Sequence, residues 1–303
     1  MFSKEVQNQM DNISEQFIRS RCFLVLAFLV GTVGITAQVQ AAEPSIQQLP
    51  GPDGKAAITC VVYEPQPIPE GKAGLIVHLY GSGGSHRKNE YNIGREPYAT
   101  CRKLLAERGY WLVVADLGRY HWMNEKACTQ LDAVIDAMIT DKNIDPKQVH
   151  LFGTSMGASS SLIYTMRRPE RIKSVVAVFP ITDFTKWLVE KPNYRVPVER
   201  AHGITPERRN DALAKLSPLM NVAAFRKVPV MLLHGDQDRV VPIHHSRDFA
   251  AALQKNGYPF IFHEVPGARH NDKIARTYQH ELADFLTKGI QPDQPASSAE
   301  KKQ

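Results

Sequence analysis

Ser155 is the residue of this chain whose surroundings best suit nucleophilic chemistry. It is the centre of the pentapeptide GTSMG, residues 153–157, which follows the apolar run VHLF and precedes small and apolar residues at helical spacing. Such a turn places the hydroxyl at a helix N-terminus, where backbone N–H groups and the helix dipole favour a developing oxyanion. The pentapeptide alone also fits an ordinary strand-to-helix turn, so the assignment depends on partner residues.

A serine hydroxyl is a weak nucleophile at neutral pH and needs a base, which in turn needs an acid to fix its tautomer. Around such a turn the partners follow in the order Ser, Asp, His, on loops beyond strand ends. Two later apolar runs end in HGDQDRVVP and GARHND, so we assign Asp238 as the acid and His270 as the base. Asp236 is the rival acid, but its place beside the strand suits bracing the turn. His263 is the rival base, but it lies inside a predicted strand.

Four other histidines are interpreted as structural. His78 and His234 each stand near the end of an apolar strand, where we expect them to be buried and hydrogen-bonded. His244 and His245 begin a predicted helix without a third ligand in view, which favours surface residues over metal ligands. We therefore predict neither a metal site nor a cofactor.

Acyl transfer also needs hydrogen-bond donors for the oxyanion. The first donor that we predict is the N–H of Met156, directly after the nucleophile. The second is expected from the glycine-rich turn GSGGS that follows the apolar run 75–80. Either the N–H of Ser82 or the hydroxyl of Tyr80 could supply it.

The elements that must position these residues alternate between strand and helix from about residue 74 to 288, after an N-terminal hairpin. This alternation predicts a mostly parallel sheet with helices on both faces. Residues Asp145 and Pro146 are expected to turn the chain into the strand before Ser155, and Asp272 to cap a single final helix. The predicted strands are 56–63, 75–80, 110–115, 149–152, 174–179, 228–233 and 259–264, and the predicted helices are 98–108, 127–140, the segment after Ser155, 243–256 and 272–285.

Two segments depart from this alternation. Residues 181–226 are too long and too rich in proline and charge for a simple connection, so we predict a small cap over the carboxyl end of the sheet. Residues 290–303 lack apolar periodicity and are predicted to form a disordered tail.

The N-terminal 41 residues have the pattern of a secretory signal peptide: a basic flank, an apolar stretch and a small-residue site before Ala42. We therefore expect an exported protein, periplasmic or extracellular, with its hydrolytic domain in residues 42–289; the alternative is an uncleaved membrane anchor. Three of the four cysteines lie beyond the signal (Cys60, Cys101 and Cys128), and one disulfide among them is possible. The net charge of +6 comes without the aromatic-basic pattern of nucleic-acid binding.

Together, GTSMG, HGDQDRVVP and GARHND resemble the α/β-hydrolase superfamily over nearly the whole mature chain. Within it, IDPKQVHLFGTSMGAS and HGDQDRVVP are similar to the catalytic domain of the prolyl oligopeptidase family and to dienelactone-hydrolase and feruloyl or acetylxylan esterase relatives. The resemblance implies an α/β-hydrolase fold and, through the Tyr80-Gly81 pair, an oxyanion role for the Tyr80 hydroxyl.

Two departures from the peptidases favour an esterase. Residues 42–73 are too few for the β-propeller that gates many of those peptidases, and the turn reads Gly157-Ala158 where they usually show two glycines. We expect a carboxylic-ester hydrolase that acts on small soluble esters or on acylated polysaccharides. A serine peptidase of the prolyl oligopeptidase family is the alternative, and a non-catalytic binding module is a minor one.

Overall fold

The computed structural model describes residues 44–84, 98–271 and 273–290, all of which belong to one compact unit, Val39–Gln303. The predicted signal peptide, the cap residue Asp272 and the predicted tail after Ile290 lie outside the described residues. Among the described helices, none is both long and apolar enough to cross a membrane.

Eight strands form one sheet in the order β1-β2-β4-β3-β5-β6-β7-β8. β1 and β2 are an antiparallel hairpin, β2 pairs antiparallel with β4, and every later pairing is parallel. All seven residues of β3 are buried, as expected for a parallel strand that is covered on both faces. The strands are β1 (Ser45–Pro50), β2 (Ala57–Tyr63), β3 (Ala73–Leu79), β4 (Tyr110–Ala115), β5 (Ile144–Thr154), β6 (Ser174–Val178), β7 (Val230–Gly235) and β8 (Phe260–Val265).

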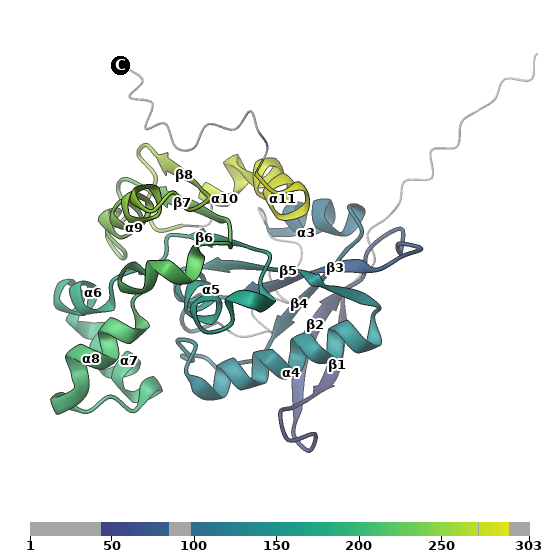
Figure 1. The fold of residues 1–303 in the computed structure, drawn as a ribbon, viewed down its shortest axis with the longest axis horizontal. Coiled ribbons are helices and arrows are strands. Elements are labelled where there is room, and N and C mark those ends of the chain that lie inside the picture. Colours follow the sequence, from purple (N-terminus) through teal and green to yellow (C-terminus); the bar gives the residue numbers. More distant parts are fainter. Residues whose placement is uncertain (1–43, 85–97, 272, 291–303) are drawn as a thin grey trace, which may run out of the picture. The chain divides into compact units, whose positions relative to one another are not determined.

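Helices cover both faces of this sheet (Figure 1). α3 and α11 contact each other on one face, whereas α4 and α5 lie on the other. The α-helices are α3 (Tyr98–Glu107), α4 (Glu125–Asp141), α5 (Met156–Arg167), α6 (Phe184–Glu190), α7 (Arg195–His202), α8 (Arg209–Leu216), α9 (His244–Lys255), α10 (Lys273–Thr277) and α11 (Gln279–Lys288). The 3₁₀ turns are η1 (Pro169–Arg171), η2 (Pro192–Tyr194), η3 (Pro206–Arg208) and η4 (Pro218–Phe225).

α4 shows how local sequence forms these elements. The side chain of Asn124 accepts a hydrogen bond from the N–H of Ala127 at 2.9 Å and so caps the helix. Leu131, Val134 and Met138 recur at helical spacing, and all three are fully buried. The predicted helix over 127–140 is therefore confirmed and is slightly longer.

The order in which strands are added to the sheet reverses at β3. The chain runs from β3 to β4 on one side, then crosses back to β5 on the other side of β3. In open α/β sheets, ligands bind beyond the carboxyl ends of the strands at such a switch point. The turn after β3 and the serine turn after β5 both lie at this edge.

The segment 181–226 contains the short helices α6, α7 and α8, which form a group beside the sheet in Figure 1. It is attached to loops that follow strand carboxyl ends. The Nε2 atom of His202 lies 3.0 Å from the carbonyl oxygen of Trp122 in the loop after β4, and Trp187 donates from Nε1 to Val240 after β7. η4 then returns to pack on α5 and α9.

Two sequence expectations are wrong in detail, and one question that the sequence left open is answered. Asp145 and Pro146 lie within β5, which begins at Ile144, rather than in a turn before it. The single final helix is two helices, α10 and α11, separated at Tyr278. The three cysteines of the described chain are buried and free, so no disulfide joins them.

Candidate active site

Ser155 occupies a strained turn between β5 and α5. Its backbone has φ 54° and ψ −120°, a conformation that a non-glycine residue rarely adopts. The turn is held by a hydrogen bond from the Ser155 N–H to the carbonyl of Val178 at 2.9 Å. A Cβ atom on Gly157 would overlap the carbonyl of Leu79, and one on Gly153 would overlap the carbonyl of Gly157. The two glycines of GTSMG are therefore required by close backbone approach.

The structure brings Ser155, His270 and Asp238 together. The Nε2 atom of His270 lies 3.0 Å from the Ser155 hydroxyl oxygen, and its Nδ1 lies 2.6 Å from Oδ2 of Asp238. These residues follow β5, β8 and β7, which end at the same edge of the sheet. A neutral imidazole with its proton on Nδ1 donates to the carboxylate and leaves Nε2 free to accept the serine proton.

The Asp238 carboxylate is buried and held by four groups. Its Oδ1 accepts hydrogen bonds from the N–H groups of Val240 and Val241 at 2.8 and 2.9 Å. Its Oδ2 faces His270 and, at 3.4 Å, the Nε2 of His234. Burial alone would raise the pKa of Asp238, but the hydrogen bonds from His234 and His270 outweigh it and hold that pKa well below its usual range. The carboxylate is therefore ionised at neutral pH.

His234 and Phe179 complete the surroundings of the acid and base, and sequence reasoning missed their roles. His234 is buried and hydrogen-bonded as predicted, with Nδ1 2.7 Å from the Ser246 hydroxyl and Nε2 2.8 Å from the carbonyl of Val241. Its spacing of four residues before Asp238 is the only sequence signal for its contact with the acid. The Phe179 ring lies 4.2 Å from the His270 ring and sits on a backbone with φ 44°.

The two rival residues lie elsewhere. Asp236 accepts a hydrogen bond from the N–H of Gly267 at 2.7 Å and so joins the turn after β7 to the turn after β8. His263 pairs with Glu281 at 2.8 Å and stacks on Tyr278. Neither residue contacts the serine through any interaction seen in the described chain.

The glycine-rich turn after β3 lies beside the nucleophile. A Cβ built on Gly81 would be 3.7 Å from the Cβ of Ser155, so the backbone of this turn passes close to the hydroxyl. Met156 begins α5, and first-turn N–H groups of a helix have no acceptor within the helix. The N–H groups of Met156 and of the exposed Ser82 stay the candidate oxyanion donors.

The Tyr80 hydroxyl is engaged elsewhere, contrary to its predicted role. It donates to the carbonyl of Gly118 at 3.1 Å and accepts from the N–H of Leu117 at 3.0 Å. Burial raises the pKa of this phenol, which keeps it protonated. Tyr80 therefore fixes the loop after β4 and does not face the oxyanion in this arrangement.

Two of the histidines interpreted as structural differ from expectation. His78 is buried, but neither ring nitrogen has a hydrogen-bond partner among the described residues, and the ring stacks on Phe152 at 4.7 Å. His245 is only 1% exposed and is not a surface residue. His244 pairs with Glu190 at 2.8 Å.

An aromatic cluster joins the 181–226 segment to the loop after β4. The Trp122 ring lies 5.6 Å from Trp187, 6.1 Å from Phe184 and 6.3 Å from Tyr194. Trp122 and Met123 both have positive φ, at 43° and 51°. Strained backbone thus follows β4 as well as β5 and β6, at the edge where the triad lies.

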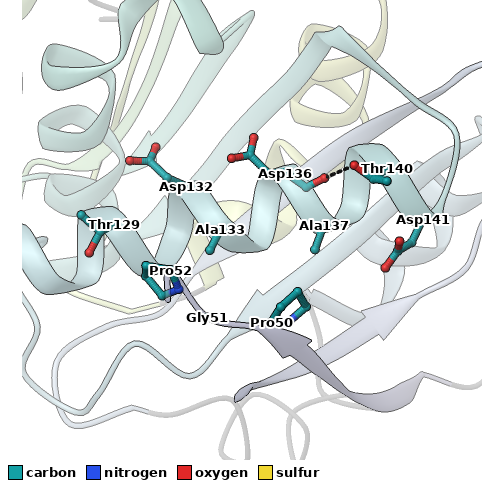
Figure 2. A pocket seen from close by; sticks show the side chains of 10 residues that line it. All are labelled: Pro50, Gly51, Pro52, Thr129, Asp132, Ala133, Asp136, Ala137, Thr140 and Asp141. Carbon is teal, nitrogen blue, oxygen red and sulfur yellow. Dashed lines mark hydrogen bonds between the residues drawn. The ribbon is translucent and has the colours of Figure 1, made fainter. Parts of the chain in front are cut away.

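A separate pocket of about 550 Å³ runs along α4 opposite the β1–β2 turn (Figure 2). Asp132 and Asp136 lie on its rim and point away from Pro50 and Pro52. Both aspartates pair with Arg171. None of the triad residues lines this pocket.

Comparison with known proteins bears on the fold and the family of this chain. L404 of Acanthamoeba polyphaga mimivirus, whose name describes an alpha/beta hydrolase, is 23% identical over 174 residues, which are 56% of this chain and 59% of L404. The chain thus spans little more than half the length of this relative.

Two solved structures share the fold. The acylaminoacyl peptidase of Pyrococcus horikoshii superposes with a TM-score of 0.66 at 15% identity and covers 87% of this chain, which matches 44% of the peptidase. Carboxyl esterase 2 of the fungus Tuber melanosporum superposes with a TM-score of 0.61 at 19% identity, covering 96% of this chain and all of the esterase. The predicted α/β-hydrolase fold is confirmed.

The family model described as the prolyl oligopeptidase family matches residues 102–292, more than half of the chain. This match includes the serine turn, the Asp238 loop and the His270 loop. With the fold and these three loops in place, the chain belongs to the prolyl oligopeptidase family.

Proposed function

We propose that this chain is a serine hydrolase that cleaves carboxylic esters through an acyl-enzyme intermediate. The observation that carries the proposal is the continuous hydrogen-bond path from the Ser155 hydroxyl through His270 to Asp238, with distances of 3.0 and 2.6 Å. Such a path activates a hydroxyl that is otherwise unreactive at neutral pH.

In the proposed mechanism, Ser155 attacks the ester carbonyl while Nε2 of His270 takes its proton. Asp238 holds the imidazole in the reactive tautomer and stabilises the imidazolium that forms. The N–H of Met156 and a donor from the turn at Gly81 and Ser82 stabilise the oxyanion. His270 then returns the proton to the leaving alcohol, and water releases the acyl group by the same steps in reverse.

The small size of the 181–226 segment, whose α6 and η2 are fastened by the Trp122 cluster, supports a small ester as substrate. We further propose export, from the signal-like residues 1–41, and acylated polysaccharides as one natural substrate class. A peptidase is the second candidate, because the matching family is named for one.

The test of the proposal is Ser155→Ala. We expect turnover of p-nitrophenyl acetate to fall by roughly 10³-fold or more, and covalent labelling by a fluorophosphonate probe to disappear. Ser45→Ala, at an exposed position of β1, is the matched control and should behave as wild type. An unlabelled wild-type protein would instead indicate a binding module.

Esterase and peptidase are separated by their leaving groups. The proposal expects a higher kcat/KM on p-nitrophenyl esters of short acyl chains than on peptide p-nitroanilides. A higher value on peptide anilides, lost in the same Ser155 variant, would replace the esterase assignment by a peptidase while leaving the triad in place.

A further inference from the structure

A cluster of three metal-ligating side chains lies outside the triad. Glu190 ends α6, while His244 and His245 begin α9, more than 50 residues later in the chain. One ligand atom from each of the three lies within 4.8 Å of the others. We propose that these residues bind a divalent transition-metal ion of the zinc class.

The spacing of the ligand atoms suits a tetrahedral ion. Zinc binds imidazole nitrogen and carboxylate oxygen at about 2.0–2.2 Å, which places neighbouring ligand atoms roughly 3.3 Å apart. Nε2 of His244 is 2.8 Å from Oε1 of Glu190, and Nε2 of His245 is 3.6 Å from Oε2 of the same carboxylate. All three ligand atoms lie within 4.8 Å of one another, so they would have to draw closer together around the ion to complete a site of two nitrogens and one oxygen, with one position left open.

The independent sign of a ligand is a buried nitrogen without a partner. His245 is 1% exposed, and its Nε2 has no hydrogen-bond partner among the described residues; the same holds for Oε2 of Glu190, which it faces. A buried polar atom left in this way is costly, and a metal ion would satisfy both atoms. The Glu190 side chain is 27% exposed, so an ion can enter from solvent.

The other ring nitrogen of His245 faces the backbone. Its Nδ1 lies 3.4 Å from the N–H of Asp183. Metal on Nε2 requires the proton on Nδ1, so this long contact is lost on binding and moderates the affinity.

A second carboxylate supports the other histidine. Oδ2 of Asp248 lies 3.7 Å from Nδ1 of His244, where it would accept the remaining ring proton once Nε2 binds metal. Lys186 lies 3.5 Å from the same Asp248 oxygen and offsets one of the two negative charges. The cluster retains a net negative charge that favours a cation.

The chain supplies a matched control for an ordinary histidine–glutamate pair. His263 and Glu281 are joined at 2.8 Å, the same distance as His244 and Glu190, but no second histidine joins them in the metal-ligating groups of the described residues. Only the α6–α9 cluster should therefore bind an ion.

The experiment is titration of the untagged, chelator-treated protein with Zn²⁺ by calorimetry, and with Co²⁺ by visible absorption. We expect one ion per chain, the absorption bands of tetrahedral Co²⁺ and a higher unfolding temperature with metal. Glu190→Gln and His244→Ala should each weaken binding about ten-fold or more, whereas His263→Ala should not.

Each other outcome overturns the proposal. These outcomes are no stoichiometric binding by wild type, unchanged binding in both cluster variants, or equal loss in His263→Ala. Binding abolished by His270→Ala but retained in the cluster variants would place the ion at the triad instead. Circular dichroism of every variant excludes loss of fold as the cause, and replacement of His244 is tolerable because its side chain is 28% exposed.

Discussion

Both carboxylate oxygens of Asp238 are held by neighbouring groups. Oδ1 accepts two backbone N–H groups from its own loop, and Oδ2 faces two imidazoles. The carboxylate cannot rotate without breaking several of these contacts at once. Orientation of His270, rather than negative charge alone, is what this arrangement supplies.

Replacement of the acid tests this role. Asp238→Asn should lower kcat on an ester substrate by about 10³–10⁴-fold, because an amide favours the wrong tautomer of His270. Asp236→Asn is the control, since its retained carbonyl oxygen can still accept from the N–H of Gly267. Similar losses in the two variants, measured by steady-state kinetics, would contradict the assignment of Asp238.

The triad residues could be chosen from sequence because each is placed by a short local motif: the order Ser, Asp, His and the loop after a strand decide them. Tyr80 could not be placed in this way. Its hydroxyl bonds to Leu117 and Gly118, nearly 40 residues away, and nothing near Tyr80 in the sequence indicates that contact. The same holds for Glu190 and His244, whose pairing depends on how α6 meets α9.

The junction of β3, β5 and α5 sets the position of the nucleophile. The backbone of α5 begins so close to the end of β3 that only glycine fits at position 157, where an added Cβ would overlap the Leu79 carbonyl. The hydroxyl, the first-turn N–H groups and the turn at Gly81 are thereby held in one place. The close approach of α5 to the end of β3 therefore sets both where these elements end and where the catalytic groups lie.

Gly157→Ala should therefore destabilise the protein by roughly 2 kcal/mol or more and reduce ester turnover, because backbone must move to admit the methyl group. Gly71→Ala is the matched control, since a Cβ there meets nothing within 4 Å and its backbone φ lies outside the left-handed region. The measurement is urea unfolding of both variants. Equal midpoints for the two would show that the turn can relax.

Strand and helix positions were largely predictable because the apolar periods are long and regular, as in β4 and α4. The helices of segment 181–226 were not, although the segment itself was recognised by its length. α6 has seven residues and α7 and α8 have eight each. Helices this short are stabilised by tertiary packing, as where α6 packs on Trp122, rather than by a pattern of their own.

Buried histidines determine how the whole molecule responds to acid. Burial lowers the pKa of His78, His121 and His150 to about 3 and that of His202 to about 4. In the unfolded chain their pKa is near 6.5, so below that pH the unfolded state binds more protons than the folded state. Stability is therefore complete at neutral pH and falls as the solution becomes acidic.

We expect the free energy of unfolding to decrease from about pH 6.5 toward pH 4, by up to ~1.4 kcal/mol per pH unit for each such histidine. Urea unfolding at a series of pH values measures this slope. His150→Phe should reduce the slope of unfolding free energy against pH by the contribution of about one proton, ~1.4 kcal/mol per pH unit. A constant free energy between pH 7 and pH 5 would show that these rings are protonated in the folded protein.

The attachment of the 181–226 segment bears on how such proteins can diverge. The Nε1–H of Trp187 donates a hydrogen bond to the carbonyl oxygen of Val240, two residues after the catalytic acid. The Trp187 ring also packs on Trp122, in the loop that Tyr80 anchors. A segment transplanted from a relative would lack the complementary partner residues in these two loops. Engineers who graft a new lid onto this scaffold will need to transfer residues 119–124 and 236–245 together with it, as a three-part cassette.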